Sequence, residues 1–431
     1  MRAPSEATLV TWAQYLTLAF VFALAFSMWL DLGTGDVALF VAKMRSATRF
    51  GAVAAFSLSP DLGYPPLASA LLAVPGTLAA ALRMDDFAAF KLFLLVFHVL
   101  ATGIIYAISR SLLIAIAFAA ALTVSAMQLG YLDILCAPFI FMGLWLMRED
   151  RPVAGLLFYT VAILIKWQPL IIAPFIVMYA FRPRGLPQSL MLLGRRDVWI
   201  TLGMLAAIVI VLRVVYGHAL AASLSGSTQN GMIWLAPNGL NLPFLCGMIY
   251  RLFADPATIP LSIRDGIYIR YHPSIYLTFR SFFALFYVAL LLAALCIGND
   301  RKRVLLLSIG AFWSYVTLST GVHENHLAVA VFVSFFAVAT DRSAWPVAVI
   351  TAILFNFNLL LFYSNSRLRD LTDVPFGVGV VLAILSFLWI LATCWRVLHE
   401  APAAQLRTLW DGWEPLRNGL RAKFSSSRAV K

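Results

Sequence analysis

Ionisable side chains are scarce in this chain. Asp, Glu, Lys and Arg together make up 12% of its 431 residues, while hydrophobic residues make up 62%. The mean hydropathy is +0.87. Soluble globular domains carry about 25% charged residues, so this composition excludes a soluble protein. It predicts an all-α, polytopic transmembrane protein.

Cysteine is also rare, and the sequence has no internal repeat, no low-complexity segment and no soluble domain. None of the cysteines has the spacing of metal ligands, and three of them lie in apolar runs, which excludes a disulfide framework and a structural zinc site. No Asp-x-Asp pair accompanies the polar motifs described below, so we expect neither a metal nor a cofactor. The four cysteines are Cys136, Cys246, Cys296 and Cys394.

Apolar runs recur along the whole chain. A helix needs about 20 apolar residues to cross a bilayer, and shorter ones are tolerated. The first run fits an uncleaved span better than a signal peptide, because it continues through Trp29. About twelve candidate spans result: 11–30, 88–108, 111–127, 131–147, 153–166, 168–181, 198–217, 274–297, 304–320, 326–340, 344–363 and 374–396.

One apolar stretch, residues 65–82, is excluded from this set. It contains Pro65, Pro66, Pro75 and Gly76, which make a poor continuous span. We expect it to form a helix lying within a long first external loop, residues 31–87, which carries amphipathic helices. Both chain termini then lie in the cytoplasm.

Lys and Arg set the expected orientation. They gather in 182–197, in 299–303 and in the basic tail 397–431, which the positive-inside rule places in the cytoplasm. The net charge of +12 fits this rule and attraction to anionic lipid better than nucleic-acid binding. The expected organisation is an amino-terminal transmembrane module (1–217) that includes the loop 31–87, an external loop (218–273), a carboxy-terminal transmembrane module (274–396) and the tail.

The most informative segment is Val322-His323-Glu324-Asn325-His326. It places two histidines, a carboxylate and an amide in four consecutive positions between apolar runs. Such groups must meet water or line a protein cavity, because burying them in hydrocarbon is costly. Ionisable groups at such places indicate function, although an ordinary hydrated turn between two helices is the alternative.

Asp36 opens the first external loop directly after Gly35, with Lys43, Arg45 and Arg49 on the polar positions of an amphipathic run. The carboxylate could be the N-cap of an interfacial helix. It could equally be a general base at the membrane surface.

Further polar residues fall on the same predicted face. Lys166 could reach towards lipid headgroups or bind a phosphate as a point charge. Because all of these polar residues are predicted on the external face of the membrane, the sequence predicts one external active site. Its other members are Asp61 and Tyr64 in a proline-rich turn, Gln128 and Asp133 at the start of a span, Gln168, Asn241 in the loop 218–273, and Arg367.

Taken in order, four short motifs resemble the GT-C superfamily of integral-membrane glycosyltransferases. The nearest resemblance is to the polyprenyl (dolichyl)-phosphate-sugar-dependent glucosyl- and mannosyltransferases and their bacterial relatives. Asn325 departs from the lysine that the family has after His-Glu, and Asp61 lies three residues before Tyr64, whereas the family's aspartate is adjacent. The motifs are Gly35-Asp36, Tyr64-Pro65-Pro66-Leu67, Lys166 with the apolar segment through Pro174, and Val322-His323-Glu324.

The resemblance implies that the chain transfers a hexose, with inversion, from a polyprenyl-phosphate donor to a glycan, lipid-linked or protein acceptor. It implies a bacterial inner or plasma membrane, an active site facing the periplasm or exterior, and no metal. Asp36 would be the catalytic base. The donor phosphate would bind His323, Glu324, His326, Lys166 and Arg367, and the substrates would contact Asp61, Tyr64, Gln128, Asp133, Gln168 and Asn241.

Two alternatives stay open. A transporter or flippase would show paired repeats and broken helices at mid-membrane, and neither is found in the sequence. A surface-polysaccharide polymerase or ligase would have a larger, arginine-rich external loop. The segment 218–273 partly fits that description, with Arg251, Arg264 and Arg270.

Overall fold

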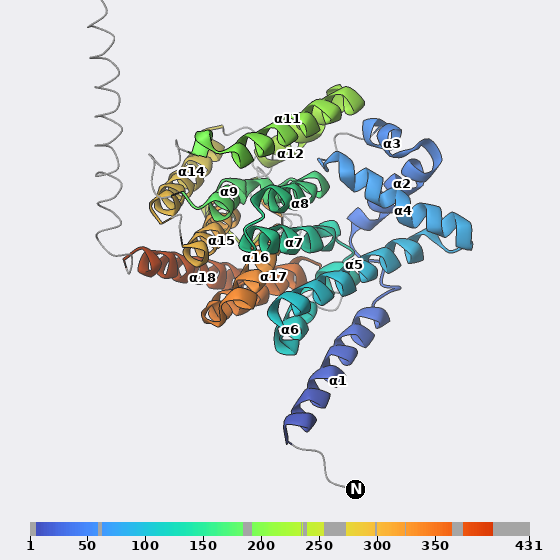
Figure 1. The fold of residues 1–431 in the computed structure, drawn as a ribbon, viewed down its shortest axis with the longest axis horizontal. Coiled ribbons are helices and arrows are strands. Elements are labelled where there is room, and N and C mark those ends of the chain that lie inside the picture. The colour runs from blue at the N-terminus through green and yellow to red at the C-terminus, as the bar shows by residue number, and fades with distance from the viewer. Residues whose placement is uncertain are drawn as a thin grey trace, which may run out of the picture.

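The computed structural model confirms the all-α, membrane-type class. It describes residues 6–58, 63–183, 192–233, 235, 239–253, 273–297, 300–323, 325–363 and 374–399, which form helices and turns and no β-strand. Six helical segments are long and apolar enough to cross a membrane. They lie in α1 (Glu6–Ser27), α5 (Asp86–Ser109), α11 (Arg196–Tyr216), α14 (Pro273–Cys296), α17 (Trp345–Tyr363) with the preceding η7 (Arg342–Ala344), and α18 (Val374–His399) (Figure 1).

Other helices occupy the remaining predicted spans, so every predicted apolar run contains a helix, and six of the twelve are both long and apolar enough to cross a membrane. Polar turns keep these helices short. The backbone of Lys166, for example, is extended (φ −149°, ψ 138°) and ends α8. They are α6 (Leu112–Thr123) with the π-helix η2 (Val124–Gln128), the 3-10 helix η3 (Leu132–Cys136) with α7 (Ala137–Arg148), α8 (Pro152–Ile165), η4 (Gln168–Ile172) with α9 (Ala173–Phe181), α15 (Arg301–Leu318) and α16 (Ala328–Thr340).

Three helices form a small bundle between α1 and α5. They are α2 (Gly35–Phe50), α3 (Ala52–Leu58) and α4 (Pro66–Leu82), which pack against one another at one edge of the molecule (Figure 1). The predicted loop helix over 65–82 therefore exists as α4, with Pro75 inside it. The predicted external loop 218–273 also contains helices, α12 (His218–Ile233) and α13 (Leu242–Phe253), and the short η5 (Leu192–Gly194) precedes α11.

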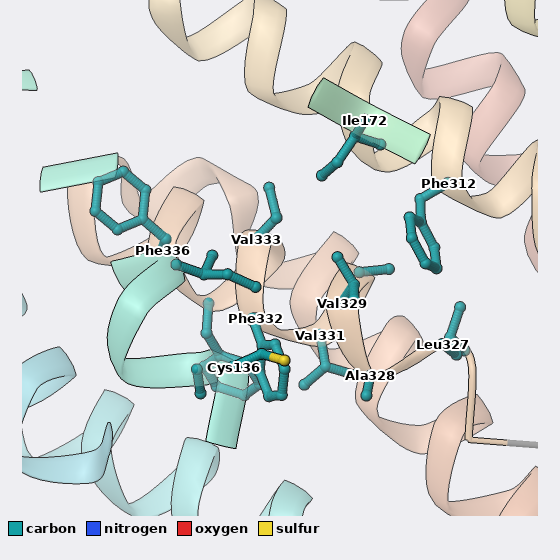
Figure 2. Close-up of a cluster of buried hydrophobic side chains, with 14 of the residues drawn as sticks. Cys136, Ile172, Phe312, Leu327, Ala328, Val329, Val331, Phe332, Val333 and Phe336 are labelled. Carbon is teal, nitrogen blue, oxygen red and sulfur yellow. The ribbon is translucent and has the colours of Figure 1, made fainter. Parts of the chain in front are cut away.

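The core lies around α16, which is buried along almost its whole length. Figure 2 shows Phe332, Val333 and Phe336 of α16 packed near Ile172 of η4 and Phe312 of α15. By contrast, Thr201 is the one buried residue of α11. The helices that converge on the core therefore come from both halves of the sequence. The apolar side chains of α11, by contrast, are mostly exposed.

Candidate functional site

One cavity of about 870 Å³ collects polar side chains from distant parts of the chain. Its walls come from α2, the start of α4, the segment around η4, α14, and the end of α15 with the turn that follows it. Among the described residues, Asp36 is the one carboxylate in the lining. The cationic or histidine side chains in the lining are Lys43, Lys166, Arg280, His323 and His326.

Asp36 is placed by the start of α2. The helix begins at Gly35, so the N-cap is Thr34 and the predicted N-cap role of Asp36 is wrong. The Thr34 N–H donates to the Leu129 carbonyl at 3.1 Å. Gly33 has φ +73°, and a Cβ there would lie 2.7 Å from the same carbonyl oxygen. Only glycine fits this approach, which fixes the first turn of α2 against the 129–130 corner.

Lys91 of α5 holds that corner from the other side. Its ammonium group donates to the carbonyls of Met127 and Gln128 at the end of η2. These carbonyls have no helical partner because the helix ends there. Gln128, predicted to contact substrate, is thus a backbone anchor and is not in the cavity lining.

Lys166 and Asp133 form a buried ion pair. The second carboxylate oxygen of Asp133 accepts a hydrogen bond of 3.3 Å from the Asn325 side-chain amide. Lys166 and Asn325 line the cavity, and Asp133 lies behind them. The structure therefore brings the predicted residues Lys166 and Asp133 together, with Asp133 as the partner that neutralises and orients Lys166.

The two histidines lie side by side, with ring centroids 5.3 Å apart. The His326 Nδ1 accepts a hydrogen bond of 3.4 Å from the backbone N–H of His323 and lies 2.9 Å from the Tyr315 hydroxyl. Because Nδ1 is an acceptor, neutral His326 carries its proton on Nε2. Its Nε2–H is then the ring's available hydrogen-bond donor.

Burial controls the charge state of the other titrating groups. It raises the pKa of Asp36, an effect that the positive charge of Lys166 opposes and the negative charge of Asp133 reinforces. Burial, together with Lys166, lowers the pKa of His323 to about 4. His323 is therefore neutral at neutral pH, and Lys166 and Arg280 line the same cavity.

Much of the remaining lining of the cavity is apolar. It is built from side chains of α2 and α4, of the η4–α9 segment, and of successive turns of α14. Apolar walls beside a polar centre are typical of small-molecule sites. These side chains include Leu39, Phe40 and Leu72, then Leu170, Ile171 and Pro174, and finally Phe283, Tyr287 and Val288.

Other predicted residues divide into three groups. Tyr64 and Gln168 line the cavity, and the Gln168 Oε1 has no hydrogen-bond partner. Asn241 lies outside the lining and caps α13, where its Oδ1 accepts a 2.9 Å hydrogen bond from the Phe244 N–H. Asp61, Glu324 and Arg367 fall outside the described residues.

Sequence reasoning missed Arg280 and misplaced Lys43. Arg280 is the sole charged residue of the apolar helix α14, a pattern that marks functional positions in membrane segments. Lys43 was expected on a polar helix face but is 5% exposed and lines the cavity. Its spacing of seven residues from Asp36 was the available signal, because this spacing returns to the same helix face.

The described residues contain no group of three or more His, Cys, Asp or Glu side chains that could hold a metal ion. No family model matches the chain, and no curated protein matches its sequence.

Proposed function

We propose that the chain is a membrane glycosyltransferase that moves a hexose from a polyprenyl-phosphate donor to an acceptor hydroxyl. One observation carries the proposal: a single cavity joins a carboxylate, Asp36, to cationic and histidine side chains that can bind a phosphate and to many apolar side chains. A lipid phosphate needs the last two together, and transfer to a hydroxyl needs the first. The GT-C resemblance, with its twelve spans and outward-facing site, belongs to the same proposal.

The donor phosphate would bind at the end of the cavity formed by Lys166, Arg280, His323 and His326. Lys166 uses one N–H on Asp133 and, with three donors on an ammonium group, keeps others for a ligand. Arg280 adds a permanent charge. The histidines act as neutral donors, as the Nδ1 contacts of His326 indicate. Such preorganised groups stabilise the charge that develops on a leaving group.

The reaction balances without a metal. The acceptor oxygen attacks the anomeric carbon, the bond from that carbon to the phosphate oxygen breaks, and the polyprenyl phosphate leaves with the bonding electron pair. Asp36 takes the hydroxyl proton as general base. Attack opposite the leaving group inverts the anomeric centre. Asn325 and Asp133 position Lys166 and do not meet the reacting atoms.

The lipid chain would lie along the apolar wall. From Arg280, the lining residues Phe283, Ala284, Tyr287 and Val288 follow at successive turns of α14. Leu170, Ile171 and Pro174 continue in the same way along η4 and α9. The apolar lining therefore extends from Arg280 along α14 and from Lys166 along η4 and α9.

The decisive experiment is incubation of the purified full chain with a panel of polyprenyl-phosphate sugars, read by mass spectrometry. We expect one donor to be consumed with release of polyprenyl phosphate, and Asp36→Asn to abolish the release. Movement of an intact lipid-linked sugar across vesicles, without cleavage, would instead identify a transporter.

The orientation is tested by labelling with an impermeant maleimide. Single cysteines replace the exposed Leu32, Leu82 and Leu193 in a background without the native cysteines. Because α4 packs on α2 and α3, we expect labelling from outside at positions 32 and 82 and not at 193. Opposite sides for 32 and 82 would mean that α4 crosses the bilayer, and the outward-facing site would be disproved.

A further inference from the structure

Lys43 is a buried ammonium group that the mechanism above does not use. It lines the same cavity as Asp36, is 5% exposed, and its Nζ has no hydrogen-bond partner. The Nζ atom lies 5.7 Å from the centroid of the Phe56 ring. A buried charge without a partner is unfavourable and is rarely kept unless a ligand uses it.

The surroundings of Lys43 lack a counter-ion within the described part of the chain. The helices α3 and α4, which pack on α2, contain no ionisable residue, and the one acid of α5, which also packs on α2, is Asp86, which pairs with Arg45. Asp36 is the nearest acid on the cavity face of α2, seven residues away. The pKa of Lys43 is lowered to about 8 by burial alone, with no charged neighbour acting on it, so the side chain is still mostly protonated at neutral pH.

Helix geometry sets Lys43 apart from the donor-phosphate end. Seven residues of α-helix advance about 10 Å and return to nearly the same face. Phe40, between the two, also lines the cavity. Asp36, the proposed contact of the attacking hydroxyl, therefore lies about two helical turns from Lys43 and near enough to Lys166, at the proposed donor-phosphate end, for that charge to act on its pKa.

We propose that Lys43 binds an anionic group, a phosphate or a carboxylate, carried by the acceptor about 10 Å from the hydroxyl that receives the sugar. The assignment of this anion to the acceptor rests on the proposed function. The presence of an anion site at Lys43 does not. It limits acceptors to molecules with a negative charge at that distance, such as phospholipid-linked glycans or acidic sugars.

The first test asks whether the site binds anions, without any transfer reaction. Lysines of the full chain are methylated reductively at pH 8 in detergent, and modification is quantified residue by residue. The probes are inorganic phosphate, pyrophosphate and glucuronate, with glucose as the neutral control. We expect an anion to slow modification of Lys43 about tenfold, which corresponds to about 1.4 kcal/mol, and glucose to have no effect. Lys302, exposed and paired with Asp341, is the control lysine.

The probes also identify the chemistry, since protection by glucuronate indicates a carboxylate and protection by phosphate or pyrophosphate a phosphate. Absence of protection by all three overturns the anion site. Asp61→Asn tests for a counter-ion from outside the described residues. Protection that appears only in that variant would show that Asp61 holds Lys43, and would equally overturn the proposal.

The second test concerns the acceptor and uses Lys43→Met with Lys43→Arg as the charge-retaining control. We expect the Met variant to lose about tenfold in kcat/KM for the acceptor, with donor hydrolysis unchanged, and the Arg variant to recover most of the loss. An equal loss in donor hydrolysis would place Lys43 on the donor phosphate and overturn the acceptor assignment. If no donor is ever consumed while Lys43 is protected, the proposed function fails and the anion site stands.

Discussion

Two lysines that line one cavity differ in whether they have a partner. Lys166 is 4% exposed and Lys43 is 5% exposed, and both line the cavity. Lys166 is paired with Asp133, whereas Lys43 has no hydrogen-bond partner. The comparison teaches that burial alone does not define a role. A paired lysine belongs to the folded structure with or without ligand, and an unpaired one is stabilised when a ligand arrives.

The largest expected effect is on transfer activity and comes from Asp36, whose carboxylate shares the cavity with both lysines. Asp36→Asn keeps the size of the side chain but removes the proton acceptor, so transfer should fall by about two to four orders of magnitude. Donor binding, measured by tryptophan fluorescence or calorimetry, should change little because Lys166 and Arg280 remain.

The matched control is Asp31→Asn, an exposed acid between α1 and α2 that lies outside the cavity lining. We expect wild-type turnover in this variant. Near-wild-type turnover in Asp36→Asn would show that Asp36 is not the base. The proposed roles of the two lysines in one transfer reaction would then lose their basis.

Breaking the ion pair between Lys166 and Asp133 should strongly reduce the stability of the folded chain. Lys166→Met leaves Asp133 as a buried charge with only the Asn325 amide, and such losses amount to about 3–5 kcal/mol. Asp133→Asn should have a comparable effect, and the double variant Asp133→Asn/Lys166→Met should recover much of it. The measurement is thermal unfolding in detergent. Additive losses in the double variant would contradict a coupled pair.

The sequence allowed the helical class, a helix in each apolar run and the nonpolar loop helix α4 to be predicted, because hydropathy and proline placement are local signals. It also identified Asp36, Tyr64, Lys166, Gln168, His323 and His326, all of which line the cavity. Partners could not be predicted in this way. Which carboxylate meets Lys166 depends on η3 approaching the end of α8, and that contact joins residues far apart in the chain.

The same reason explains where expectation and structure differ. Asn241 and Gln128 are polar residues near helix ends, and the sequence does not record that Asn241 caps α13 or that the backbone carbonyl of Gln128 accepts from Lys91. Lys43 has the spacing of a solvated helix face, but α3 and α4 cover that face. The covering depends on tertiary packing, which the local pattern does not record.

The charges around Asp36 should also appear in the pH profile. A base works only when ionised, and burial raises the pKa of Asp36 above that of an ordinary carboxyl group. Activity should therefore fall by up to about tenfold per pH unit below that pKa. Because Lys166 lowers this pKa and Asp133 raises it, Lys166→Met should move the acid limb to higher pH and Asp133→Asn to lower pH. A limb that moves in the same direction in both variants would assign it to another group.

The smallest effect is expected at Lys43, the lysine without a hydrogen-bond partner. Its substitution should raise stability, whereas substitution of Lys166 should lower it. Lys43→Met replaces a buried ammonium group by an apolar side chain of similar length, which relieves desolvation without leaving a counter-ion exposed. We expect stability in the absence of ligand to rise by about 1 kcal/mol, seen as a higher midpoint of thermal unfolding in detergent. Lys166→Met in the same assay is the control, because it should lower the midpoint. If Lys43→Met destabilises the chain as much as Lys166→Met does, Lys43 has a structural partner, and the proposed difference between the two lysines is wrong.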